Sequence, residues 1–503
     1  VLDYHWYLKN VENAFKLFGR SDLLAEVFYR PLLNLLFLID AQIYGQKVYG
    51  YHLTNILIHL LNAYLVFLLL KGLRYSVSWA YLSALIFLVH PALVSAVSWI
   101  PGRTDSLLSL FAFFSFIAFQ KFCQSKKWSF GLWHLLALTA ALLVKETAIG
   151  LPFFCGLYVI LIRKENVFER RYCLLECIWL VIAIGWFIIR KNLTDQNDTI
   201  TWMIIYQSVF NNSSAFVTYL GKIILPVNLS VLPIIKDTQI IWGCAAILML
   251  ISGIVLSKSK DYGYLIFGLL WYVLFLLPSM VVSFLFHEYR LYLPMIGIFI
   301  VLLEIVGGRQ ARLSRWKFVV VLLLIVVFAG MSFIRSDNYK ERFAFWKSAV
   351  QTSPHSPLAH RNLGAMYFLV DDLDKAEQAF RASAKLNFKE QMVHNNLGLI
   401  YMRRGNLVSA EKEYLLEIKF NPTYDNVYYN LGLLYYMQKK FDQAVQSWKK
   451  TIALNPLYID AYKLLAVHYY NTRNLSALSY YVNQLKMRRV DYPLQYDQLL
   501  NQQ

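Results

Sequence analysis

The sequence predicts an all-α protein in two parts, a polytopic helical membrane domain followed by an α-solenoid of helical repeats. Of its 503 residues, 58% are hydrophobic and 16% are charged, and the mean hydropathy is +0.43. This composition is far more apolar than that of an ordinary soluble protein. Ten apolar runs follow one another between residues 52 and 334, and a repeat with a 34-residue period comes after them.

Residues 1–51 are polar and aromatic, and we expect them to form an external first loop with interfacial helices. Their one apolar run, Pro31–Ile39, is shorter than the roughly 20 residues that a bilayer crossing needs. This length predicts a helix that lies in the membrane interface.

Residues 52–334 are predicted to form the transmembrane domain. The ten candidate spans are 52–70, 78–98, 105–121, 129–144, 148–162, 174–189, 239–256, 263–285, 291–306 and 317–334. Segment 203–225 is apolar but interrupted by polar residues, so charge bias decides whether it crosses. If it stays on one side, the loops rich in lysine and arginine share a single face, which the positive-inside rule makes cytoplasmic. Residues 190–238 are therefore assigned to an external loop.

Charged residues stand at the ends of several apolar runs, where charge is costly and usually functional. Three such sites are Arg103 with Asp105, Lys145 with Glu146, and Glu288 with Arg290. An even number of spans puts all three on the external face, together with residues 1–51 and the C-terminal part. The sequence therefore predicts that the three sites gather.

A connector, residues 335–353, leads to a repeat domain at 354–503. The aligned positions are Leu363, Leu397, Leu431 and Leu465; Tyr367, Tyr401, Tyr435 and Tyr469; and Ala376, Ala410 and Ala444. This is the tetratricopeptide pattern, in which helix pairs stack into a curved solenoid with a concave protein-binding surface. Leu478 replaces the small alanine of the fourth unit, which indicates a terminal repeat capped by 483–503.

The charged external face suits a reaction between a membrane-bound phosphate and an external acceptor. Arginine and lysine hold phosphate through charge-assisted hydrogen bonds, and a carboxylate can deprotonate an acceptor hydroxyl. Asp3, in the aromatic opening of the chain, is the best placed acid.

Each candidate also has a structural interpretation. Arg103 and Asp105 could pair with each other at a hairpin, and Lys145 with Glu146 could form a structural ion pair. His90, before Pro91, is as well explained by helix capping as by ligand binding. A polar stripe along one helix is better explained by interhelical hydrogen bonds than by catalysis; its members are His52, Asn55, His59 and Asn62.

Several motifs together resemble a known family. They are Asp3 in an aromatic loop, Tyr29-Arg30-Pro31-Leu32, Tyr51-His52-Leu53-Thr54-Asn55 with His59 and Asn62, His90-Pro91, Gly102-Arg103-Thr104-Asp105, Lys145-Glu146, and Glu288-Tyr289-Arg290-Leu291-Tyr292-Leu293-Pro294, followed by the repeats. In this order they resemble the multispan, tetratricopeptide-repeat-containing proteins related to O-mannosyltransferases, in the C-type glycosyltransferase superfamily. The resemblance covers essentially the whole chain.

The resemblance implies a hexosyltransferase, with mannose as the expected sugar, that uses a polyprenyl-phosphate-linked donor and inverts the sugar carbon. It implies eleven spans, so that a first span would precede Val1. Asp3 matches the first-loop acid of the superfamily, although Tyr4 stands where related proteins often carry a second acid. Arg103, Lys145 and Arg290 are then expected to hold the donor phosphate. The supporting residues are Arg30, His52, His90, Asp105, Glu146, Glu288 and Tyr292.

The expected partners are the lipid-linked sugar, an acceptor protein or glycan, membrane lipid, and proteins bound by the repeats. The basic residues flank apolar runs, which argues against nucleic acid, and no metal-binding spacing is present; no cofactor is predicted, and a divalent metal stays an open alternative. The expected location is a bacterial inner membrane with periplasmic repeats, or an endoplasmic reticulum membrane with luminal repeats. The alternative functions are a non-catalytic membrane-anchored scaffold, which ranks below the enzyme, and a lipid or glycan transporter.

Overall fold

The computed structural model describes residues 5–23, 27–194, 202–257, 260–281, 287–310 and 313–500. Asp3 lies outside these residues. The chain divides into two compact units, Val1–Thr352 and Ser353–Gln503. The first unit carries the apolar helices and the second carries the repeats.

Short helices open the first unit: α1 (His5–Leu8), α2 (Asn13–Lys16) and η2 (Leu17–Gly19), followed by α3 (Pro31–Tyr44). Proline suits the first position of α3, because its fixed backbone angle is helical and it has no amide hydrogen to leave unpaired. Gly45 ends the helix at a positive φ of 59°. The predicted apolar run 31–39 is therefore a helix, and it packs against the beginning of α4.

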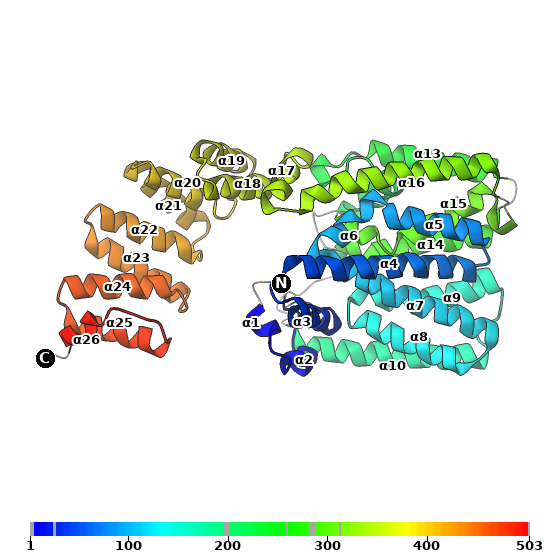
Figure 1. Cartoon of the computed structure of the whole chain (residues 1–503), viewed down its shortest axis with the longest axis horizontal. Coiled ribbons are helices and arrows are strands. Elements are labelled where there is room, and N and C mark those ends of the chain that lie inside the picture. The colour runs from blue at the N-terminus through cyan, green and yellow to red at the C-terminus, as the bar shows by residue number, and fades with distance from the viewer. Residues whose placement is uncertain are drawn as a thin grey trace. The chain divides into compact units, whose positions relative to one another are not determined.

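Within the described residues, the ten predicted apolar runs are largely helical, and Figure 1 shows most of these helices running alongside one another. In order, the unit contains α4 (Val48–Gly72), α5 (Val77–Val89), η3 (Pro91–Leu93), α6 (Val94–Ser98), η4 (Ile100–Gly102), α7 (Arg103–Ser125), α8 (Trp128–Leu142), η5 (Glu146–Gly150), α9 (Leu151–Leu157), η6 (Tyr158–Arg163), α10 (Arg170–Leu193), α11 (Trp202–Asn211), α12 (Ser214–Ile224), η7 (Ile235–Asp237), α13 (Ile241–Leu256), α14 (Tyr262–Val281), η8 (Glu288–Leu291), α15 (Met295–Val306), η9 (Gly308–Gln310), α16 (Arg315–Ser336), η10 (Asp337–Tyr339) and α17 (Arg342–Thr352).

Within the described residues, six helices are long and apolar enough to cross a membrane, and the bent pair formed by α5 with η3 and α6 makes a seventh candidate. The remaining predicted spans, α8, α13 and α15, have 15, 16 and 12 residues. Segment 203–225 forms two helices, α11 and α12, of 10 and 11 residues, and neither is long enough to cross alone.

The polar stripe of α4 faces the protein interior and bonds to other helices. Asn55 donates to the Val97 carbonyl at 2.9 Å, and Asn62 donates to the Ser106 carbonyl at 2.8 Å. His59 contacts the Tyr292 hydroxyl through Nδ1 at 2.6 Å and the Leu88 carbonyl through Nε2 at 2.9 Å. The interhelical interpretation is thus confirmed for these three residues, whereas His52 is only partly buried.

Helices α14 and α15 approach closely at two glycines. A Cβ atom on Gly297 would overlap the carbonyl oxygen of Gly268 and would lie 2.7 Å from the Tyr272 amide nitrogen. Because these neighbours are backbone atoms of a packed helix, they cannot rotate away.

Replacing Gly297 with alanine is therefore expected to lower the free energy of unfolding by about 1–3 kcal/mol, the usual cost of overpacking. Gly330 on α16 is a matched control, since its Cβ position meets nothing within 4 Å. Thermal unfolding of both variants in the same detergent measures the difference, and equal melting temperatures would contradict the close packing.

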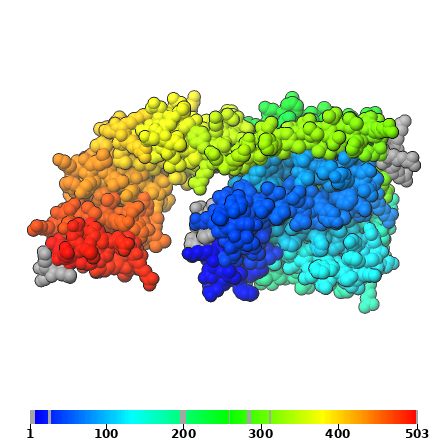
Figure 2. Space-filling view, in the orientation of Figure 1, coloured from blue at the N-terminus to red at the C-terminus, as the bar shows by residue number. Residues whose placement is uncertain are grey.

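The second unit consists of four helix pairs and a final helix: α18 (Pro357–Leu369) with α19 (Leu373–Leu386), α20 (Val393–Arg403) with α21 (Leu407–Phe420), α22 (Asp425–Met437) with α23 (Phe441–Leu454), α24 (Ile459–Asn471) with α25 (Leu475–Met487), and α26 (Gln495–Leu500). The repeated leucines and alanines are buried, as the period predicts. Gly364 and Gly398 admit aromatic rings, Phe380 and Tyr414, from the second helix of each pair. Tyr496 on α26 is buried in the terminal core, and Figure 2 shows the red C-terminal residues at the end of the repeat unit.

Candidate functional site

The centre of the candidate site is an ion pair between two of the predicted charged sites. Lys145, between α8 and η5, places its Nζ 2.8 and 2.9 Å from the two carboxylate oxygens of Asp105 on α7. The Lys145 side chain is 13% exposed and that of Asp105 is 9% exposed, so the pair is neither sealed nor freely solvated. Asp105 therefore pairs with Lys145, and the hairpin pair with Arg103 does not form.

Arg30 and Glu146 extend the charges beside this pair. Arg30, immediately before α3, lies 3.3 Å from Glu146 and 4.0 Å from the buried Asp22, and its guanidinium covers the ring of Phe28. The amide of Leu32 donates to the carbonyl of Leu143 at 3.2 Å. The first loop is thereby joined directly to the segment that holds Lys145.

The third predicted charged site, at η8, lies within electrostatic range of the same group. Burial lowers the pKa of Arg290, but Tyr219, Tyr289 and Asp105 outweigh burial and raise it. Arg290 also donates to the Ser279 carbonyl at 3.2 Å and is only partly buried. Arg30, Lys145 and Arg290 all keep some exposure to solvent, and the charge of Asp105 acts on Arg290 as well as on Lys145.

Aromatic rings stack beside Arg290. The His287 and Tyr289 rings are stacked with centroids 4.9 Å apart, and Trp99 stacks on His287 at 6.1 Å. Burial and the charge of Arg290 lower the pKa of His287 to about 4. His287 is therefore neutral at physiological pH, and the stack offers an uncharged aromatic surface of the kind that packs against sugar rings or apolar chains.

Arg103, in contrast, is enclosed. Its side chain is 0% exposed and forms an ion pair of 2.5 Å with Asp40 on α3. Its remaining hydrogen bonds go to Asn55 and to the Tyr51 carbonyl, at 2.5 and 2.8 Å, and its guanidinium covers the Phe37 ring. These contacts tie α3 and α4 to the beginning of α7, so Arg103 orients the segment that carries Asp105.

Glu288 is also enclosed, at the centre of a buried charged triad. It accepts from Lys222 on α12 at 2.6 Å, from Arg335 on α16 at 3.4 Å, and from the Ser230 amide at 3.1 Å. The triad joins η8 to α12, α16 and the 225–240 loop. It therefore fixes the backbone that presents Arg290.

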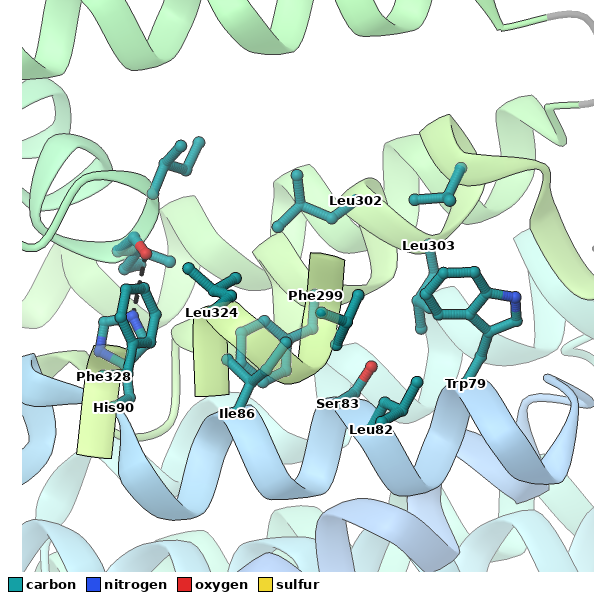
Figure 3. A pocket seen from close by; sticks show the side chains of 14 residues that line it. Trp79, Leu82, Ser83, Ile86, His90, Phe299, Leu302, Leu303, Leu324 and Phe328 are labelled. Atoms are coloured by element: carbon teal, nitrogen blue, oxygen red, sulfur yellow. Dashed lines mark hydrogen bonds between the residues drawn. The ribbon is translucent and has the colours of Figure 1, made fainter. Parts of the chain in front are cut away.

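His90 caps a helix, as one of the two sequence interpretations proposed. Its Nδ1 accepts from the Ala92 amide at 3.2 Å and its Nε2 contacts the Ile223 carbonyl at 2.9 Å. Figure 3 shows His90 and Trp79 at opposite ends of a largely apolar cavity of about 280 Å³ between α5, α12, α15 and α16. Both ring nitrogens are engaged, so His90 acts as a structural residue in this conformation.

Tyr292 is buried and bonded to His59, and His52 lies partly buried one helical turn before Asn55. The structure thus pairs Arg30 with Glu146 and Lys145 with Asp105, and it places Arg290 within electrostatic range of Asp105. Arg103 and Glu288 are instead enclosed by other partners. Among the described residues, no group of three or more His, Cys, Asp or Glu could hold a metal ion.

Sequence reasoning missed three partners: Asp40, Lys222 and Arg335. Asp40 was detectable, because it is a lone acid one residue after an apolar run. Lys222 was noted only as a polar interruption of the 203–225 segment, and Arg335 looked like an ordinary flanking cation. Nothing in the sequence pairs either one with Glu288.

Three family models match the chain. Residues 30–190 match the dolichyl-phosphate-mannose-protein mannosyltransferase model, and residues 371–425 and 426–458 match tetratricopeptide-repeat models. The first match contains Arg30, Asp105, Lys145 and Glu146.

Curated relatives are named protein O-mannosyl-transferases. The chain is 23% identical over 352 residues to F38B6.6 of Caenorhabditis elegans, which covers 67% of this chain and 50% of the relative. It is 26% identical over 407 residues to TMTC4 of Homo sapiens, which covers 67% and 55%. A shorter match, 31% identical over 140 residues, links it to Tmtc1 of Drosophila melanogaster and covers 27% of this chain and 16% of the relative.

These matches span about half, or less, of the length of the curated relatives. Among solved structures, the crystal structure of MamA aligns with a TM-score of 0.27 and 16% identity, covering 36% of this chain and 99% of that one.

The helices and the family models define a multispan helical membrane protein with a C-terminal tetratricopeptide-repeat solenoid, and residues 30–190 of this protein are similar to mannosyltransferases. The chain is similar to the tetratricopeptide-repeat-containing protein O-mannosyl-transferases, and the resemblance inferred from its motifs is confirmed.

Proposed function

We propose that this protein transfers a hexose, most simply mannose, from a polyprenyl-phosphate carrier to a hydroxyl group of an external acceptor protein, with inversion at the sugar carbon. The single observation that carries the proposal is the partly exposed group of Asp105, Lys145 and Arg290, with Arg30 and Glu146 beside it. This group lies largely within the region that matches the mannosyltransferase model.

Lys145 and Arg290 hold the donor phosphate in this proposal. Both cations remain partly exposed, so a phosphate can approach them from solvent. Asp105 orients Lys145, and Glu146 orients Arg30, which adds a third positive charge at the rim. A charge-assisted clamp of this kind stabilises the phosphate that departs as the bond to the sugar breaks.

Asp3 accepts the proton of the acceptor hydroxyl as that oxygen attacks the sugar carbon. Arg103 and Glu288 act as positioning residues, because the first orients the start of α7 and the second orients η8. We infer that the repeats bind the acceptor or a partner protein, on the endoplasmic reticulum luminal or the periplasmic side.

The test is a transfer assay with purified protein in liposomes and a panel of labelled polyprenyl-phosphate sugars. One donor is expected to support transfer, and the product is expected to have the opposite anomeric configuration. Asp3→Asn is expected to lower turnover by about 10²-fold, in the usual range for a general base, and Arg290→Gln by a similar factor through lost phosphate stabilisation.

Lys340→Gln serves as the control for charge removal, since the Lys340 side chain is 69% exposed and forms only a surface pair. Its activity is expected to stay within twofold of the wild type. Failure of every donor, with folded protein and a panel of acceptor peptides, would contradict the enzyme and favour the membrane-anchored scaffold.

A further inference from the structure

A second charged region lies at the other end of the membrane unit. Helix α4 begins beside Arg103 and ends beside Arg74; its 25 residues make it roughly 37 Å long. At that end, a hollow of about 790 Å³ is lined by Arg74, Lys164, Lys260, Asp261, Tyr262, Gly263, Glu304, Gly307 and Arg309. These residues come from four loops that the sequence analysis placed together on the cytoplasmic side.

A buried carboxylate holds this hollow in shape. Glu304 is 1% exposed, accepts from the Tyr75 hydroxyl at 2.8 Å and accepts from the Asp261 amide at 2.9 Å. Asp261 in turn pairs with Arg309 at 2.9 Å. The walls are therefore joined by specific bonds between the α4–α5, α13–α14 and α15–α16 loops.

The fourth loop is held by close backbone packing. A Cβ atom on Gly263 would lie 2.5 Å from the carbonyl oxygen of Leu161 in η6, which leads directly to Lys164. The Tyr264 hydroxyl donates to the Leu73 carbonyl at 3.1 Å, next to Arg74. The backbone that carries Lys164 and Arg74 is therefore held in place by contacts with the beginning of α14.

The two acids of the hollow, Asp261 and Glu304, are bonded to other groups, whereas three of its cations form no ion pair within the described residues. Arg74 and Lys164 are exposed, and neither forms an ion pair with another of the described residues. Lys260 donates to the Ile254 carbonyl and lies over the ring of Tyr262, and it forms no ion pair with another residue in the described part of the chain. Three positive charges therefore face a hollow whose carboxylates are bonded to other groups.

We propose that this hollow binds the phosphate of an anionic lipid headgroup in the cytoplasmic leaflet. Basic pockets between spanning helices on this side suit phosphorylated headgroups, because the leaflet itself is negatively charged and each cation near its surface adds attraction. A phosphomonoester accepts several charge-assisted hydrogen bonds at once, which matches cations arriving from separate loops. This site is independent of the proposed transfer reaction.

The experiment measures bound lipid by native mass spectrometry after the full chain is exchanged into phosphatidylcholine nanodiscs, with or without phosphatidylinositol 4-phosphate. The wild type is expected to retain one phosphorylated lipid per chain. Arg74→Gln combined with Lys164→Gln is expected to weaken retention by roughly 10- to 30-fold, the effect of two cations near the surface. Both residues are exposed, so the variant should fold.

Lys126→Gln combined with Lys127→Gln is the matched control, because it removes two exposed cations on the same predicted face but outside the hollow. Its retention is expected to equal that of the wild type. Equal losses in both variants, or none in either, would overturn the site. A further arm adds inorganic phosphate to the nanodiscs that contain phosphatidylinositol 4-phosphate. Displacement of the lipid only at a far higher phosphate concentration supports the lipid site, whereas displacement at a concentration equal to that of the lipid would overturn it in favour of a free phosphate.

Discussion

Replacing Arg103 with leucine is expected to lower the free energy of unfolding by about 3–5 kcal/mol, because it leaves Asp40 buried without its countercharge. Asp40 is 2% exposed, and its other bond is to the Thr54 hydroxyl at 2.7 Å. One neutral hydroxyl cannot compensate a carboxylate removed from water. The expected result is a large loss of folded protein, measured by the melting temperature in detergent and by the yield of monodisperse protein.

The double variant Arg103→Leu with Asp40→Leu separates this explanation from a role in donor binding. Removing both charges of a buried pair is often nearly neutral, so the double variant is expected to recover most of the lost stability. If Arg103 holds the donor phosphate instead, the single variant will melt like the wild type and will bind the lipid-linked sugar more weakly. That outcome would contradict the positioning role.

Replacing Glu288 with glutamine is expected to have an effect of similar size, about 3–5 kcal/mol, because it leaves Lys222 and Arg335 facing each other without a negative charge. Their side chains are 4% and 8% exposed, so water does not screen them well. Glutamine keeps the shape of glutamate, and the loss therefore reports charge rather than volume. Glu169→Gln is the control: Glu169 has a 44% exposed side chain in a surface pair with Arg171, and a change below about 1 kcal/mol is expected.

The Glu288 triad also predicts a dependence on pH. Burial alone would raise the pKa of Glu288, but Lys222 and Arg335 outweigh burial and hold it below its ordinary value of 4.5. A carboxylate with a depressed pKa contributes stability that is present above the unfolded-state pKa and is lost as the pH falls through the folded-state pKa. Unfolding measured from pH 7 to pH 3 should show a loss of stability below about pH 4.5 that is smaller in Glu288→Gln. Identical acid profiles for the two proteins would argue against an ionised Glu288.

Most of the architecture was predictable because its causes are periodic or compositional. Within the described residues the ten apolar runs are largely helical, although 78–98 and 148–162 are each divided into shorter helices. The 34-residue period places the buried leucines and alanines of the repeats correctly. The stripe formed by Asn55, His59 and Asn62 was also assigned correctly, since polar groups inside a membrane helix must find partners on other helices. The lengths of α8, α13 and α15 were less predictable, because loops and turns take residues from the ends of an apolar run.

The sequence predicted which residues are candidates for the site, but it did not predict how they pair. Charged residues at the ends of apolar runs are rare enough to be recognised, so the sequence singled out Asp105, Lys145, Glu146 and Arg290 as candidates. Their pairing was not, because residues such as Asp105 and Lys145 lie 40 positions apart and no periodic pattern relates them.

By itself, then, the sequence determined the helical membrane unit and the solenoid, both of which follow from hydropathy and spacing. Only the tertiary structure decided which cations are open and which are enclosed. Arg103 and Lys145 look alike as charges at the ends of apolar runs, yet Arg103 is sealed against Asp40 while Lys145 keeps access to solvent. The physical reason is that the cost of burying a charge is offset by partners from distant segments, and helix packing alone brings those partners together.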